Sequence, residues 1–153
     1  MSTSIIKNDQ IERIPATEDD ASKAIPRLRQ FIGLAQISVM ARNCRGEEGQ
    51  FFLDKIVELD GQIQSMPKSY QTDGQGGQAV AFLHYFTGSW DWYITEKDAG
   101  NGGQYQAFGL ACGFEIELGY ISIAEIIRAG AELDLHWTPT TLDAIKASRK
   151  KAA

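Results

Sequence analysis

The fold is decided by residues 79–114, AVAFLHYFTGSWDWYITEKDAGNGGQYQAFGLACGF. The first segment, 79–86, is apolar on both faces, which is typical of a central strand. In the segment 90–95, large apolar residues alternate with more polar ones, so this segment predicts a strand with one buried face. A turn at 87–89 and a polar loop at 96–103 separate these strands from a third one at 105–114.

The third strand has a face of large residues and a face of small residues. The large face carries Phe108, Leu110, Cys112 and Phe114, and the small face carries Ala107, Gly109, Ala111 and Gly113. Small side chains allow another element to approach closely, and we expect a helix to pack there. Cys112 alternates onto the apolar face and is expected to be a core residue.

The segment after these strands predicts a short capped helix and a return to the sheet. Ser122 is a suitable N-cap, Glu125 completes a capping box, and Gly130 ends the helix. Apolar residues then alternate with polar ones, so we expect a last strand at 133–137. Proline in the first turn suits a final helix over 139–149.

The chain before residue 68 predicts helices. Residues 1–24 read as a polar lead-in, and a helix is expected to start with Pro26 in its first turn. A second helix is expected from about Glu47 to Met66, because apolar residues recur there at alternating steps of three and four. The recurring apolar residues form a seam along the second helix. We expect this seam to pack against the first helix within the chain, as an antiparallel hairpin, and a homodimer contact through the same seam is the alternative.

The expected fold class is therefore α+β, with an N-terminal helical hairpin followed by a mostly antiparallel β-sheet packed with short helices. The expected division is a helical segment at 1–67 and an α+β domain at 68–153. A chain of 153 residues can bury a sizeable core, and we expect the two parts to form one compact unit.

Charge is unevenly distributed in this chain, whose net charge is −5. Residues 71–143 contain two basic residues, Lys97 and Arg128, against ten Asp/Glu, a net of −8. Because this segment repels phosphate, we expect no direct nucleic-acid binding through the sheet domain. It is suited to basic partners or cations, although the same excess of acid also favours solubility.

Neither a membrane span nor a secretory signal is visible in the sequence. Cys44 and Cys112 have no CxxC spacing, and neither they nor His84 and His136 are paired at ligand spacing. The glycine-rich loop at 72–77 fits no nucleotide fingerprint. We therefore expect a cytoplasmic protein with reduced thiols that contacts no membrane and needs no metal or cofactor.

Three segments occur in an order that resembles a known family. They are WDWYITE at 90–96, FGLACGFEIELGYISIAE at 108–125 and LDLHWTP at 133–139. Together they resemble a family of bacterial proteins of unknown function that occur on plasmids, integrative elements and phages. The resemblance covers roughly residues 68–145 and implies a setting, an accessory gene of mobile DNA, without implying an activity.

Few residues suggest catalysis. Asp134 and His136 are two apart and would share a strand face, where the carboxylate could orient the imidazole for proton transfer. Strand-end acids such as Glu96, Glu117 and Asp134 could serve a metal-dependent hydrolase or nuclease, which is the alternative function. That class also needs a lysine beside the acids and a basic groove, and Lys97 directly follows Glu96 without the usual spacing.

Aromatic residues beside acids point to protein binding instead. We expect Trp90, Trp92, Glu117 and Tyr120 to contact a protein partner encoded by the host or by the mobile element. The expected function is binding of a macromolecule without catalysis, and inhibition of host defence, such as restriction or CRISPR machinery, is a concrete form of it.

Overall fold

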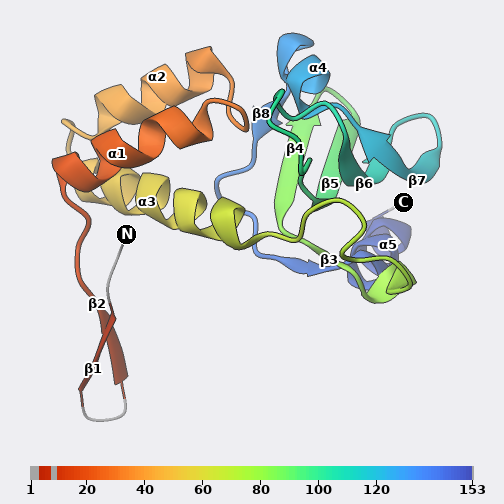
Figure 1. The fold of residues 1–153 in the computed structure, drawn as a ribbon, viewed down its shortest axis with the longest axis horizontal. Coiled ribbons are helices and arrows are strands. Elements are labelled where there is room, and N and C mark those ends of the chain that lie inside the picture. Colours follow the sequence, from red (N-terminus) through yellow and green to blue (C-terminus); the bar gives the residue numbers. More distant parts are fainter. Residues whose placement is uncertain (1–3, 8–9, 153) are drawn as a thin grey trace. The chain divides into compact units, whose positions relative to one another are not determined.

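The computed structural model describes residues 4–7 and 10–152, and the side chains of residues 14–151 (Figure 1). It divides into two compact units, Met1–Ser65 and Met66–Ala153. The protein belongs to the α+β class, with helices in the first unit and a five-stranded antiparallel sheet in the second. Among the described residues, no helix combines the length and the apolar composition needed to cross a membrane.

The first unit begins with a hairpin and a helix where a polar lead-in was expected. Its elements are β1 (Ser4–Lys7), β2 (Gln10–Arg13), α1 (Glu18–Leu28), α2 (Leu34–Asn43) and α3 (Gly49–Ser65). Residues 1–3 and 8–9 of the expected lead-in lie outside the described residues. The expectation is wrong for α1, because Thr17 and Asp20 form a reciprocal capping box and the acidic residues that follow Thr17 favour the positive end of the helix.

Three helices therefore replace the expected two-helix hairpin. Pro26 lies near the end of α1 instead of in a first turn. The chain turns at 29–33, which resets the helical phase, so that Ile37 and Met40 are buried while Val39 is exposed. One helix cannot run through this break, and the expectation of a helix that starts with Pro26 in its first turn is therefore wrong.

Helices α1 and α3 pack together through an apolar seam and one ion pair. The seam expected in the second helix is buried at Ile56, Leu59 and Ile63. Beside it, the Arg27 guanidinium donates to both carboxylate oxygens of Asp60, with N–O distances of 2.7–3.1 Å. Asp60 is only 7% exposed, so its charge is compensated by this fork-like contact.

The second unit contains the sheet. Its elements are η1 (Gly76–Gln78), β3 (Val80–Ala81), β4 (Leu83–Thr87), β5 (Trp90–Glu96), β6 (Ala107–Cys112), β7 (Ile116–Ile121), α4 (Ile123–Arg128), β8 (Glu132–Leu133), β9 (Thr140–Thr141) and α5 (Leu142–Ala152). The sheet order is β7-β6-β5-β4-β8, and β3 pairs separately with β9. Every pairing between these strands is antiparallel.

Two expected strands differ from the structure. The segment 79–86 divides at Phe82 into β3 and β4, because the two halves pair with different partners. The segment 133–137 is a strand only as far as Leu133, since Asp134 accepts the backbone N–H of His136 at 2.9 Å and turns the chain. Conversely, residues 116–121, to which no element was assigned, form β7.

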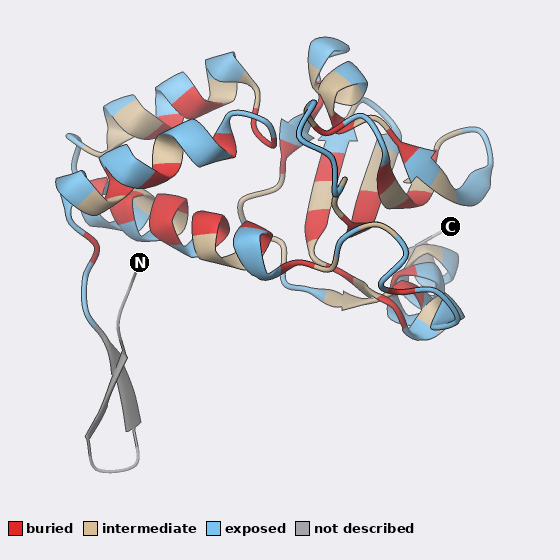
Figure 2. Ribbon diagram, in the orientation of Figure 1, coloured by how far each residue is buried: buried red, intermediate tan, exposed pale blue. Residues whose placement is uncertain are grey.

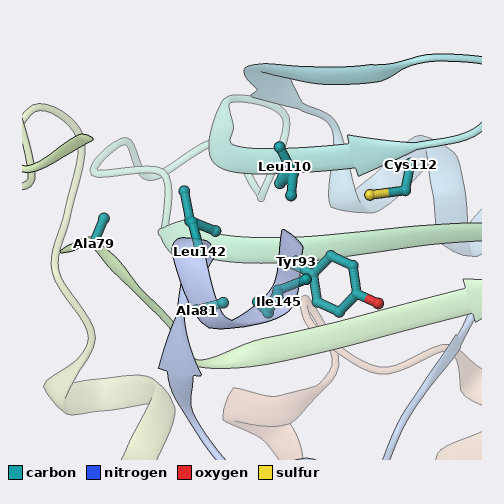
Figure 3. Close-up of a cluster of buried hydrophobic side chains, with 7 residues drawn as sticks. All are labelled: Ala79, Ala81, Tyr93, Leu110, Cys112, Leu142 and Ile145. Carbon is teal, nitrogen blue, oxygen red and sulfur yellow. The ribbon is translucent and has the colours of Figure 1, made fainter. Parts of the chain in front are cut away.

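The two faces of the sheet differ in what they carry, as the strand pairing shows. The helix face carries Tyr93, Leu110 and Cys112, and it packs against Leu142 and Ile145 of α5 (Figure 3). The opposite face, here called the tryptophan face, carries Trp92 beside Ala111, which in turn lies beside Glu117. Burial is greatest along the central strands (Figure 2), and the core position expected for Cys112 is confirmed.

Candidate functional site

The tryptophan face carries a row of aromatic rings at the end of the β6–β7 connection. Trp90 and Trp92 stack with ring centroids 5.8 Å apart and planes 19° apart. Phe114, in the connection between β6 and β7, meets Trp90 edge to face at 5.7 Å. Phe114 is 97% exposed, so this row ends in an aromatic residue that lies almost entirely in solvent.

Two glycines leave room for the close packing around this row of aromatic rings. A β-carbon added at Gly113 would overlap the six-membered ring of Trp90, so the absence of a side chain lets the indole lie flat over the strand. At Gly109 the close neighbour is the backbone carbonyl of Tyr93. Gly113, just after β6, therefore accommodates an aromatic ring, and Gly109 within β6 accommodates a neighbouring strand, where a helix was expected.

Three of the four residues expected to bind a partner lie on one face. Trp90, Trp92 and Glu117 share the tryptophan face, with Glu117 exposed on β7. Tyr120 lies opposite Phe108 on the helix face, and its hydroxyl donates to the Tyr70 hydroxyl at 3.3 Å. This hydrogen bond is the main cause of a raised pKa of Tyr120.

Glu96 is a buried acid whose hydrogen bonds hold a loop. Its carboxylate accepts the backbone N–H groups of Tyr70 and Thr72 at 2.8 and 2.9 Å, and it also accepts the Thr72 hydroxyl. Tyr70 has a positive φ of 71°, which few residues other than glycine adopt, and this bond holds it there. With Glu96 only 4% exposed, its oxygens are engaged in fixing the segment 68–78 to the sheet.

A chain of hydrogen-bonded polar side chains that the sequence did not predict lies on the helix face. His84 Nδ1 is 2.9 Å from Asp134 Oδ2, and His84 Nε2 is 2.7 Å from Asp91 Oδ1. Arg149 Nη1 donates to the other oxygen of Asp91 at 3.1 Å. The imidazole stacks on Tyr93 with centroids 4.7 Å apart and planes 9° apart. We call Asp134, His84, Asp91 and Arg149 the histidine network.

The histidine network ties β4, β5, the turn after β8 and α5 together. Because carboxylates accept, both bonds of His84 form together when both ring nitrogens carry protons. A general base needs a free nitrogen that faces the substrate, and here both nitrogens face carboxylates. The Arg149 pKa is raised: burial opposes the charge, but its hydrogen bonds to Asp91 and Tyr93 outweigh burial.

The neighbouring groups on the helix face are not activated for nucleophilic attack. Burial raises the pKa of the Cys112 thiol, which keeps it in the weakly nucleophilic protonated form. Burial likewise raises the pKa of Tyr93. Both groups belong to the hydrophobic core cluster on this face.

The expected Asp134–His136 pair is wrong in its geometry. His136 is an exposed turn residue whose backbone N–H donates to Asp134 Oδ1, while the imidazole that Asp134 contacts belongs to His84. The reason is the end of β8 at Leu133, after which Asp134 and His136 no longer share a strand face.

The three acids considered for metal-dependent hydrolysis are not brought together. Glu117 is on β7 at one edge of the sheet, Asp134 follows β8 at the other edge, and Glu96 is engaged with the loop. Within residues 14–151, no three His, Cys, Asp or Glu side chains form a group that could hold a metal ion. The three acids considered for the alternative function thus lie in three separate places.

Comparison with known proteins adds no relative to this picture. No family model, no curated protein and no solved structure matches the chain.

Proposed function

We propose that this protein is an accessory protein of a mobile genetic element and that it acts by binding another protein. The binding surface is the aromatic patch, defined as Trp90, Trp92, Phe114 and Glu117. The genetic setting is part of this proposal and rests on the resemblance inferred from the sequence segments at 90–96, 108–125 and 133–139.

The exposure of Phe114 is the observation that carries the proposal. A phenylalanine that is 97% exposed, and that packs edge-on against Trp90, leaves apolar surface in water without gaining core packing. Aromatic residues are enriched at the centres of protein interfaces, where they supply much of the binding free energy. Contact with a partner would cover this surface.

Charge favours a basic partner. Residues 71–143 have a net charge of −8, and Glu117 on β7 lies two strands away from Trp92 on β5, with Ala111 of β6 between them. An arginine or lysine of the partner could lie over the exposed indole of Trp90 and pair with Glu117. Proteins that bind nucleic acids present such basic surfaces, and the restriction and CRISPR machinery of a host cell is the concrete class we propose.

The test is inhibition of DNA cleavage by purified restriction endonucleases and Cas nucleases. We expect the wild-type protein to inhibit at least one of them and Phe114→Ser to require at least a tenfold higher concentration. Leu34→Ser is the matched control, since Leu34 in α2 is also largely exposed, at 73%. Equal inhibition by Phe114→Ser and wild type would overturn the choice of surface.

Transfer of a plasmid into a restricting host tests the biological role. We expect a plasmid that carries the wild-type gene to enter such a host more efficiently than one that carries the Phe114→Ser gene. No inhibition of any nuclease, together with equal transfer of the two plasmids, would overturn the proposed function.

A further inference from the structure

Strand β7 is an open edge of the sheet. It pairs along its whole length with β6, and no other described strand pairs with its outer side. Ile116, Leu118 and Tyr120 alternate along it and are 52%, 50% and 58% exposed. Natural edge strands are commonly protected by lysine, proline, a bulge or a short length. The six residues of β7, IELGYI, contain neither lysine nor proline. The register shift in the sheet lies between β5 and β6, so it does not protect β7.

The exposed stripe borders a cavity on the helix face. This cavity has a volume of about 330 Å³, and Leu118 itself lines it together with Phe108 of β6 and Leu142 of α5. Asp73 and Thr72 line it from the preceding loop. An apolar side chain placed beside Leu118 would therefore find further apolar surface next to it, with a carboxylate at the cavity wall.

The tryptophan face of the same strand sets a different requirement. Glu117 points to that face between Ile116 and Leu118, and Glu115 precedes the strand. Directly opposed residues of neighbouring strands interact, and opposite charges there are favourable whereas like charges are not. A strand added to β7 is thus matched by a basic residue opposite Glu117 and by apolar residues opposite Ile116, Leu118 and Tyr120.

We propose that β7 binds an extended segment of a partner protein by strand addition, and that this segment alternates basic with apolar residues. The inference rests on the proposed protein-binding function and names how a partner segment is recognised. Backbone hydrogen bonds to β7 supply affinity, and the alternating side chains supply specificity. A second copy of this chain is disfavoured as the occupant, because its own β7, IELGYI, has no basic residue to lie opposite Glu117.

The probe is a capped heptapeptide in which lysine or arginine alternates with valine or leucine. Its binding is measured by fluorescence anisotropy at two salt concentrations. A peptide of the same composition, with its basic and apolar residues in separate blocks, controls for simple charge attraction. A peptide that is N-methylated at alternate positions controls for backbone pairing. We expect both control peptides to bind at least tenfold more weakly than the alternating peptide.

Variants locate the peptide on the protein. We expect Leu118→Lys to weaken binding at least tenfold and Glu117→Lys to weaken it and to reduce its salt dependence, while Leu34→Lys has no effect. Both positions on β7 are exposed, and equal melting temperatures would show that the variants fold. Should Leu118→Lys fail to fold, Glu117→Lys decides the matter alone.

The outcomes separate this inference from the proposed function. Equal binding of the alternating and N-methylated peptides, or no binding, overturns strand addition, whereas nuclease inhibition that depends on Phe114 can still stand. A dimer in sedimentation that Leu118→Lys dissociates would also overturn it, because the occupant would then be a second copy. Peptide binding that Leu118→Lys abolishes and Phe114→Ser leaves intact supports it even if no nuclease is inhibited.

Discussion

Replacing His84 by phenylalanine tests whether the histidine network stabilises the second unit. Phenylalanine keeps a ring that can stack on Tyr93 but loses the contacts at 2.9 Å to Asp134 and 2.7 Å to Asp91. Hydrogen bonds to charged groups contribute about 1.5–3 kcal/mol each. Both carboxylates are 26% exposed and regain some water, so we expect a total loss of about 2–4 kcal/mol in the free energy of unfolding.

Urea unfolding followed by tryptophan fluorescence is a suitable assay for this change. All three tryptophans of the chain lie in the second unit, so fluorescence reports on the unit that holds the network. A double-mutant cycle with Asp134→Ala should give a coupling of about 1–2 kcal/mol between the two positions. A coupling below about 0.5 kcal/mol, with His84→Phe as stable as wild type, would refute the view that these bonds hold the sheet and α5 together.

Three further changes test other parts of the second unit. Gly113→Val should displace the Trp90 ring that lies over it, lowering stability by about 1–3 kcal/mol and altering the near-ultraviolet circular dichroism. Burial raises the pKa of the fully buried Tyr85. The contribution of Tyr85 to the free energy of unfolding should therefore be complete below the pKa of about 10 of an unfolded tyrosine and should fall as the pH rises above it. In urea titrations between pH 9 and 11, Tyr85→Phe should remove up to about 1.4 kcal/mol per pH unit of that decline. Ile123→Ala should cost about 2–5 kcal/mol because Ile123 is fully buried, and Ser122→Ala only about 1 kcal/mol for the lost cap; melting temperatures in the reverse order would contradict the packing of α4.

The β-sheet could be predicted from local sequence because alternation is a strong signal. Strand β6 lies within the expected segment 105–114, and β5 covers the expected segment 90–95 and extends by one residue, Glu96, into the expected loop. The N-cap expected at Ser122 is confirmed by its bond to the Glu125 N–H at 3.1 Å. The alternation of Ile116, Leu118 and Tyr120 is a strand signal as well, and it could have identified β7 before the structure.

Contacts between distant residues could not be predicted in the same way. The spacing of Asp134 and His136 suggests a shared strand face, but a short side-chain bond to the backbone produces a turn instead. The actual partner, His84, is far away in the sequence, and only the pairing of β4 with β8 brings it near. A polar residue inside the otherwise apolar run 79–86 was the one local sign that His84 needed polar contacts.

Part of the candidate surface could be predicted from the alternation of residues along a strand. Trp90 and Trp92 share a face by alternation alone, and Glu117 joins them through the register of β5, β6 and β7. Tyr120 is three residues from Glu117 and therefore points to the opposite face. The importance of Gly113 emerged only when the Trp90 ring was located above it, because a glycine pattern alone does not show what approaches it.

The pairing of β3 with β9 has a consequence for how the second unit folds. These two strands lie at opposite ends of the unit, and the whole five-stranded sheet is contained in the loop that they close. Loop closure becomes more unfavourable with length, and folding slows as contacts become less local. The hairpin of β4 and β5 can form soon after its residues leave the ribosome, whereas β3 must wait for β9 to be synthesised. During translation, Val80 and Ala81 therefore stay unpaired for longer than any neighbouring strand, and this is the interval in which a nascent chain most needs protection from aggregation.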